Sequence, residues 1–113
     1  MTKAILTLFF LLLSLSAGIL ALADEQKTWC VAKPSSEDIV LNQNLEFACK
    51  SNFGCTIFGE GGPCFLPNNL MNHASIAMNL YYQANGRKPY DCSFGNSGLV
   101  VLTDPSYGSC IYA

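Results

Sequence analysis

Six cysteines carry the most definite chemistry in this chain of 113 residues. They are Cys30, Cys49, Cys55, Cys64, Cys92 and Cys110, all downstream of an apolar amino-terminal segment. An even number of cysteines in a short exported chain is typical of a disulfide framework, and six of them could form three bridges in roughly 15 different pairings. The turn-rich residues between Cys49 and Cys55 would let those two sulfurs meet, whereas spacing fixes no other pair.

The amino-terminal segment, residues 1–23, is typical of a secretory signal peptide. Lys3 supplies the positive charge, residues 4–15 are almost entirely apolar, and Ala21-Leu22-Ala23 fits a cleavage site. A membrane anchor would need about 20 apolar residues without such a site, and the small residues 16–18 interrupt the run. We therefore expect cleavage after Ala23, export, and no membrane anchor on the mature chain.

Other groups that could support catalysis or bind a metal are sparse. His73 is the only histidine, and the thiols are consumed by disulfides, so neither a metal site nor a nucleophile activated by histidine is expected. Glycoside hydrolysis needs two carboxylates that face each other, and the spacing of Glu60, Asp91 and Asp104 does not require them to converge. We expect no enzymatic activity, no metal and no cofactor, and we expect His73 to be a hydrogen-bonding residue of a helix.

Aromatic rings and planar amides are the remaining groups with recognisable chemistry. The C–H faces of sugar rings pack on aromatic side chains, and sugar hydroxyls bond to amides and carboxylates. The aromatic residues downstream of the leader are Trp29, Phe47, Phe53, Phe58, Phe65, Tyr81, Tyr82, Tyr90, Phe94, Tyr107 and Tyr112. We expect Phe47 and Tyr81 in the core, and Tyr82 and Tyr107 at the surface. This inventory, together with many asparagines, suits a neutral glycan.

Charge and size narrow the class of protein further. Removal of Lys3 with the leader leaves five basic against eight acidic residues, a net charge of −3. This balance argues against binding to nucleic acid or to an anionic membrane surface. The mature chain is long enough for one domain but too short for a core that is stable without crosslinks. We expect a monomer.

Two helices and a short strand are predicted to position these groups. A serine cap and acidic residues predict a first helix over residues 36–50. A second helix is expected to begin after Asn69 and to end at Gly86, because its apolar residues recur along one face. The β-branched segment 98–103 favours a buried strand, with residues 110–112 as a candidate partner. The fold class is therefore small, disulfide-rich α+β: two packed helices, a small antiparallel sheet and long loops.

Five short motifs add a family resemblance to this interpretation. They are Trp29-Cys30-Val31-Ala32, residues 61–68, His73-Ala74-Ser75, Tyr81-Tyr82-Gln83 and residues 103–110. With all six cysteines in the same order, the chain from residue 28 to residue 112 resembles the plant X8 domain, also called the family 43 carbohydrate-binding module. That family occurs as carboxyl-terminal modules of β-1,3-glucanases, in plasmodesmal callose-binding proteins and as free-standing proteins similar to pollen allergens. This chain resembles the free-standing type.

The resemblance implies a disulfide pairing, a ligand and a location. The pairing is Cys30 with Cys92, Cys49 with Cys55, and Cys64 with Cys110. The ligand is β-1,3-glucan such as callose, bound without catalysis by a secreted protein of the plant cell wall or apoplast, with plasmodesmata as one candidate place. The residues that we expect to contact glycan are Trp29, Phe65, Asn68, Asn69, Tyr82, Tyr90, Asp104 and Tyr107.

Two other classes of protein are alternatives to a glycan-binding domain. A disulfide-rich apoplastic interaction protein, such as an inhibitor or a signal, could use the same aromatic residues to contact protein. A lipid carrier would need an apolar cavity, which two helices are too few to enclose.

Overall fold

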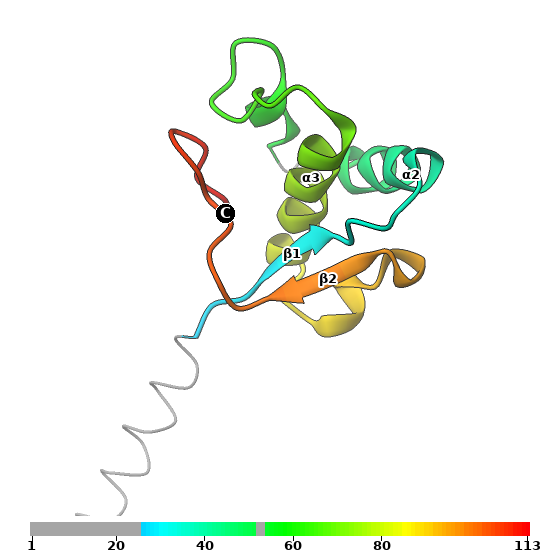
Figure 1. Ribbon diagram of the computed structural model, residues 1–113. Helices are drawn as coiled ribbons and strands as arrows, with labels where there is room; N and C mark the ends of the chain where they lie inside the picture. Colours follow the sequence, from blue (N-terminus) through cyan, green and yellow to red (C-terminus); the bar gives the residue numbers. More distant parts are fainter. Residues whose placement is uncertain (1–25, 52–53) are drawn as a thin grey trace, which may run out of the picture.

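The computed structural model describes residues 26–51 and 54–113 (Figure 1). The predicted signal peptide, residues 1–23, lies outside the described residues. The described elements are β1 (Trp29–Ala32), α2 (Asp38–Cys49), α3 (Leu70–Ala84) and β2 (Gly98–Val101), with short 3-10 turns η1 (Cys55–Phe58), η2 (Pro89–Cys92) and η3 (Phe94–Asn96). The packed helices, the antiparallel sheet and three disulfides confirm the predicted fold class.

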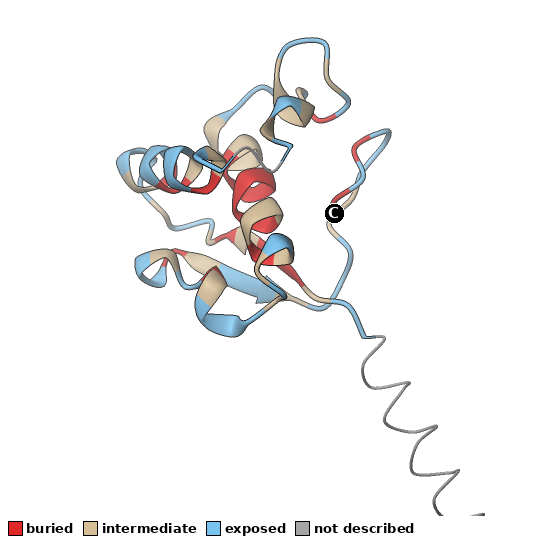
Figure 2. Ribbon diagram, turned by 180° about the vertical axis from the view of Figure 1, so that it is seen from behind, coloured by how far each residue is buried: buried red, intermediate tan, exposed pale blue. Residues whose placement is uncertain are grey.

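Helix α3 is the central element, and all its residues from Ala74 to Asn79 are buried. Asn69 caps its start by accepting a hydrogen bond from the Asn72 backbone N–H at 2.8 Å. Gly86, at a φ of 85°, closes its end, as the sequence predicted. Because α2 packs on one side of α3 and β1 on another, more than one face of the helix is removed from water (Figures 1 and 2).

Polar side chains of α3 satisfy the edge of β1 that does not pair with β2. The Ala32 N–H donates to Ser75 Oγ at 3.0 Å, and the Cys30 N–H donates to Asn79 Oδ1 at 3.0 Å. One turn further along, Gln83 Nε2 donates to the carbonyl just before β1 at 2.8 Å. These three residues are spaced four apart, so they form one stripe along the helix. The stripe takes the place of a further strand.

The sheet differs from the prediction in its pairing. Strand β2 pairs antiparallel with β1, with Trp29 opposite Val101 and Ala32 opposite Gly98, and not with residues 110–112. Cys110 forms an isolated bridge with Tyr107 instead. The expectation of a buried strand is also wrong, because Leu99 and Val100 are exposed. Since α3 occupies the free edge of β1, β2 remains at the outer edge of the two-stranded sheet.

Two further expectations, both about helix α2, are wrong. It begins at Asp38, preceded by Glu37 without a side-chain cap, so the predicted serine cap at residue 36 is wrong. Phe47, expected in the core, is 51% exposed. The buried residues of α2 are Leu41, Asn44 and Ala48. Phe47 lies beside this stripe, and its ring packs against other aromatic rings at the surface.

The three disulfides have the pairing that the resemblance implied. They join Cys30 to Cys92, Cys49 to Cys55, and Cys64 to Cys110, over sequence separations of 62, 6 and 46 residues. In the chain-entropy model the two long closures stabilise the fold by about 4 kcal/mol each and the short closure by about 2 kcal/mol. These amounts are comparable with the whole stability of a small domain.

The backbone of Cys92, which is crosslinked to Cys30, lies very close to the start of β2. A Cβ atom on Gly98 would lie 1.7 Å from the Cys92 carbonyl oxygen. We expect Gly98→Ala to lower the melting temperature by about 10 °C or more, because the backbone would have to shift. Gly86→Ala is the control, since a Cβ there meets no atom within 4 Å and adds only the cost of its positive φ. Thermal unfolding followed by circular dichroism measures both, and equal melting temperatures would contradict the steric argument.

Candidate functional site

Two adjoining hollows lie where the carboxyl-terminal segment passes the start of α3. The first, which we call the loop hollow, has a volume of about 400 Å³ and lies between residues 61–66 and residues 107–109. The second, the helix-end hollow, has a volume of about 570 Å³ and surrounds the first turns of α3. Leu66 lines the loop hollow and the next residue, Pro67, lines the helix-end hollow. We call the two together the groove.

Tyr107 links the two hollows. Its ring lines the loop hollow and is 37% exposed. Its hydroxyl lies 2.8 Å from the Leu66 carbonyl oxygen and 3.0 Å from Asn72 Oδ1, so the single phenolic proton is shared between two acceptors. Asn72 is oriented in turn by its Nδ2 group, which donates to the carbonyls of Cys64 and Pro67 at 3.3 and 3.1 Å. The aromatic ring is therefore held in a defined position.

Covalent and backbone contacts support the loop hollow from behind. The Cys64–Cys110 disulfide joins its two walls, with 4.7 Å between the Cα atoms. Tyr107 and Cys110 exchange two backbone hydrogen bonds, at 3.0 and 2.8 Å. Gly62 fits against the Ile57 carbonyl oxygen so closely that a Cβ would lie 2.4 Å from it. The loops of this hollow are thus fixed although they lack regular structure.

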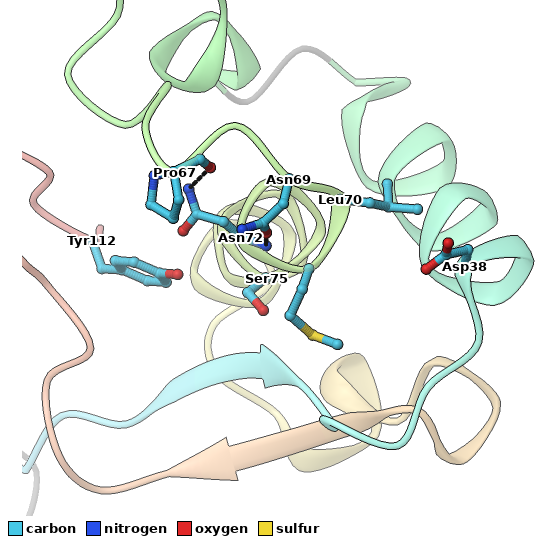
Figure 3. A pocket seen from close by; sticks show the side chains of 8 residues that line it. Asp38, Pro67, Asn69, Leu70, Asn72, Ser75 and Tyr112 are labelled. Atoms are coloured by element: carbon cyan, nitrogen blue, oxygen red, sulfur yellow. Dashed lines mark hydrogen bonds between the residues drawn. The ribbon is translucent and has the colours of Figure 1, made fainter.

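Polar groups surround the helix-end hollow. Figure 3 shows Asn69, Asn72 and Ser75 on α3, with Tyr112 on one side and Asp38 of α2 on the other. The Asn69 and Ser75 oxygens accept hydrogen bonds from the backbone, so part of this polarity serves the fold. Burial raises the pKa of Tyr112 to about 12, with a smaller contribution from Tyr107. Tyr112 is therefore neutral over the physiological pH range.

A short turn positions Tyr112. Asp104 accepts hydrogen bonds from the Ser106 hydroxyl at 2.6 Å and from the Ser106 N–H at 2.9 Å, which lower the pKa of the Asp104 carboxyl group. The Ser106 hydroxyl oxygen accepts in turn from the Tyr112 N–H at 2.9 Å. Asp104 is exposed, and these contacts occupy one of its carboxylate oxygens with the turn.

The structure brings four of the eight expected site residues together. Phe65 and Tyr107 line the loop hollow, Asn69 lines the helix-end hollow, and the exposed Asn68 is adjacent to Asn69. Sequence reasoning missed Leu66, which is 68% exposed, as well as Asn72 and Tyr112. An Asn-x-x-Asn pattern at a helix start could have indicated Asn72, because the Asn72 N–H bonds to the cap residue.

The other four expected residues line neither hollow. Asp104 lies in the turn that positions Tyr112. Tyr82 is 1% exposed, so its expected surface position is wrong: it packs in the core, and its hydroxyl is 2.7 Å from Thr28 Oγ1. Trp29 is buried with Cys64 and Cys110 behind the groove. Tyr90 is 68% exposed, but it lines a different hollow near the end of α3.

His73 is a hydrogen-bonding residue of α3, as expected. Its Nε2 atom lies 2.8 Å from the Phe65 carbonyl oxygen, and its ring stacks on Phe58 with 5.2 Å between the ring centroids. It therefore holds the backbone of Phe65 at the wall of the loop hollow. Within residues 26–51 and 54–113, no group of histidine, cysteine or acidic side chains is arranged to hold a metal ion. In the same ranges no helix has the length and apolar character needed to cross a membrane.

Comparison with known proteins finds relatives of two kinds. A glucan endo-1,3-beta-glucosidase of Triticum aestivum is 46% identical over 84 residues, which are 74% of this chain but 18% of that protein. The major pollen allergen Ole e 10 of Olea europaea is 41% identical over 87 residues, which are 76% of this chain and 71% of that protein. The chain thus spans less than a fifth of the glucosidase and most of the allergen.

The family model of the X8 domain matches residues 28–99. These residues include β1, both described helices and five of the six cysteines, and the Cys64–Cys110 disulfide ties the following segment to the same unit. The extent of the match and the similarity to the pollen allergen show that this chain belongs to the X8 domain family.

Proposed function

We propose that this protein is a secreted, non-catalytic domain of the plant cell wall, comprising residues 28–112, that binds linear β-1,3-glucan such as callose along the groove. The observation that carries the proposal is the position of Tyr107. Its exposed ring lines the loop hollow together with Phe65, and its hydroxyl donates a hydrogen bond to Asn72 Oδ1. The groove thereby offers an apolar surface and planar amides side by side. Relatives named for action on 1,3-β-glucan are 46% and 42% identical to this chain over 84 and 83 residues.

The chemistry of the groove matches a glucose polymer in two respects. The C–H face of a pyranose can pack on the Tyr107 ring and on the exposed Leu66 side chain. Asn68 and Asn69 are exposed and follow Leu66 closely in the sequence, so their amides can bond to sugar hydroxyls. Both hollows are open to solvent, which suits part of a polymer chain better than an enclosed small molecule.

The charges near the groove favour a neutral ligand. Asp38 lines the helix-end hollow, and Asp104 is exposed in the turn that positions Tyr112. An acidic polysaccharide would bring further negative charge toward these carboxylates, whereas β-1,3-glucan is uncharged. Asp38 has no acidic partner among the described residues that line either hollow, and glycoside hydrolysis requires a pair of carboxylates. This supports binding without cleavage.

Rigidity of the groove supports affinity for a flexible polymer. The Cys64–Cys110 disulfide, the Tyr107 hydroxyl and the His73 ring each hold one of the loops that form its walls. A site that is ordered before binding loses less conformational entropy when the ligand arrives. Most of the conformational entropy that is lost on binding is then that of the polymer.

Retention on insoluble polysaccharide tests the proposal directly. We expect the mature protein to sediment with insoluble β-1,3-glucan but not with cellulose, and soluble laminari-oligosaccharide in excess to release it. Absence of retention at high protein concentration would reject glucan binding. Retention that the oligosaccharide does not reduce would indicate non-specific adsorption, and it would leave an interaction protein as the better interpretation.

Two substitutions at one position separate the ring of Tyr107 from its hydroxyl. Tyr107→Ala should weaken laminari-oligosaccharide binding about 10-fold, because stacking on an aromatic ring is worth about 1–1.5 kcal/mol. Tyr107→Phe keeps the ring and loses only the contacts to Leu66 and Asn72, so we expect the smaller decrease. Isothermal titration calorimetry measures both.

Leu102→Ala serves as the matched control, because Leu102 is exposed and lines neither hollow. Its affinity should equal that of the native protein. Native affinity in Tyr107→Ala, with the fold intact by circular dichroism, would remove Tyr107 from the site.

A further inference from the structure

A cluster of aromatic rings lies at the surface near the ends of both helices, away from the groove. Phe47 of α2, Tyr81 of α3, and Phe94, Tyr90 and Asp91 of the following turns line a hollow of about 230 Å³, which we call the aromatic hollow. Tyr81, expected in the core, is partly buried, whereas Phe47 and Tyr90 are exposed.

Three of these rings hold one another in place. The ring centroids of Phe47 and Tyr81 are 5.2 Å apart, those of Tyr81 and Phe94 are 5.7 Å apart, and those of Phe47 and Phe94 are 6.2 Å apart. The ring planes are tilted by 57° to 83°, close to the edge-to-face arrangement that aromatic pairs favour. The cluster is therefore rigid, yet it leaves an aromatic surface in contact with water.

Two local features of the aromatic hollow destabilise the folded domain in the absence of a ligand. Phe94 has a φ of 42°, a left-handed backbone conformation that a bulky side chain rarely adopts. Asp91 Oδ2 is shielded from solvent and accepts no hydrogen bond from the described residues. Strained backbone clusters at ligand-binding and active sites, and a buried acceptor without a hydrogen bond calls for an explanation. They make the aromatic hollow more than a packing contact between two helix ends.

The chemistry of the aromatic hollow selects the kind of ligand. Its rings offer an apolar surface on which the C–H face of a sugar can pack, and Asp91 is the acidic residue among those that line it. The carboxylate disfavours anions, and the nearby Lys88 ammonium, 5.8 Å from the centroid of the Tyr90 ring, disfavours a cation. The volume is below that of pockets for drug-sized molecules and suits a single sugar ring better than a segment of protein.

The aromatic hollow is too far from the groove to be part of the same subsite. Asn69 caps the start of α3, and Tyr81 lies in its last turns. Twelve residues separate them in the sequence, which correspond to about 18 Å along a helix. A short oligosaccharide in the groove would leave the aromatic hollow unoccupied.

From these observations we propose that the aromatic hollow is a second binding site for a neutral hexose unit, so that one domain holds two segments of glucan. The inference rests on the proposed function for the nature of the polymer, but its site is separate. Two sites on one rigid domain would crosslink neighbouring glucan chains and raise the avidity for insoluble polymer.

Titration with laminaritriose tests the second site, because this sugar is shorter than the separation of the sites. Backbone amide NMR signals should shift in two groups, residues 107–109 of the groove and residues 90–95 of the aromatic hollow, and calorimetry should give two sugars bound per protein. The double variant Phe47→Ala/Tyr90→Ala should lose only the second group and one bound sugar. In Tyr107→Ala only the first group should need about 10-fold more sugar to reach the same shifts.

Each outcome decides between the two proposals. One bound sugar with shifts confined to residues 107–109 would overturn the second site and leave glucan binding by the groove intact. Shifts confined to residues 90–95 would also overturn it as an additional site and would move the proposed function to the aromatic hollow. Complete absence of shifts would reject both.

Tyr90→Ala alone and Leu102→Ala provide folded controls. Tyr90 is 68% exposed, so its truncation should leave the melting temperature unchanged while it weakens the second site several-fold. Leu102 lines none of these hollows, so its variant should bind two sugars. If Tyr90→Ala and the double variant both retain two bound sugars, the aromatic hollow is not the second site.

Discussion

The hydrogen bonds from β1 to Ser75 and Asn79 attach the sheet to α3, and both candidate sites depend on that attachment. Asn79 makes the link twice, because its Nδ2 group also donates to the Ala113 carbonyl at 3.2 Å. One buried side chain thus positions the first strand and the last residue of the chain against the same helix. Losing it would leave the Cys30 N–H without an acceptor in the core, at a cost of about 1–3 kcal/mol.

The two long disulfides fix the segments that lie at opposite ends of α3. Cys30 lies on β1, and its bond to Cys92 fixes η2, which carries Tyr90 and Asp91 of the aromatic hollow. Cys64 and Cys110 fix the loops of the groove. Each site combines helix residues with irregular backbone, and the irregular part of each has a crosslink within a few residues. This explains how a small domain with little regular structure can hold binding residues in fixed positions.

The predictability of each element follows from how local its determinants are. Helix α3 was predicted well, because its cap and its closing glycine are local signals. Strand β1 was not predicted, because it has four residues and its edge is satisfied by side chains of a distant helix. Tyr82 was misplaced for a related reason: a single apolar stripe was assumed, whereas α3 is buried on more than one face. In the groove, Tyr107 and Phe65 were expected from their type and Tyr112 was not, since its position depends on the Asp104 turn.

The energetic scale of the crosslinks explains why so many rings can remain at the surface. Fully burying an aromatic side chain contributes about 1.5–3 kcal/mol. Phe47 and Tyr90 are 51% and 68% exposed, so together they forgo about 2–4 kcal/mol. One long disulfide offsets that difference at about 4 kcal/mol. A domain of this size without crosslinks would need those rings in its core, where they could not contact a ligand. The disulfides therefore contribute to binding as well as to stability, because the stability that they supply allows aromatic side chains to remain at the surface.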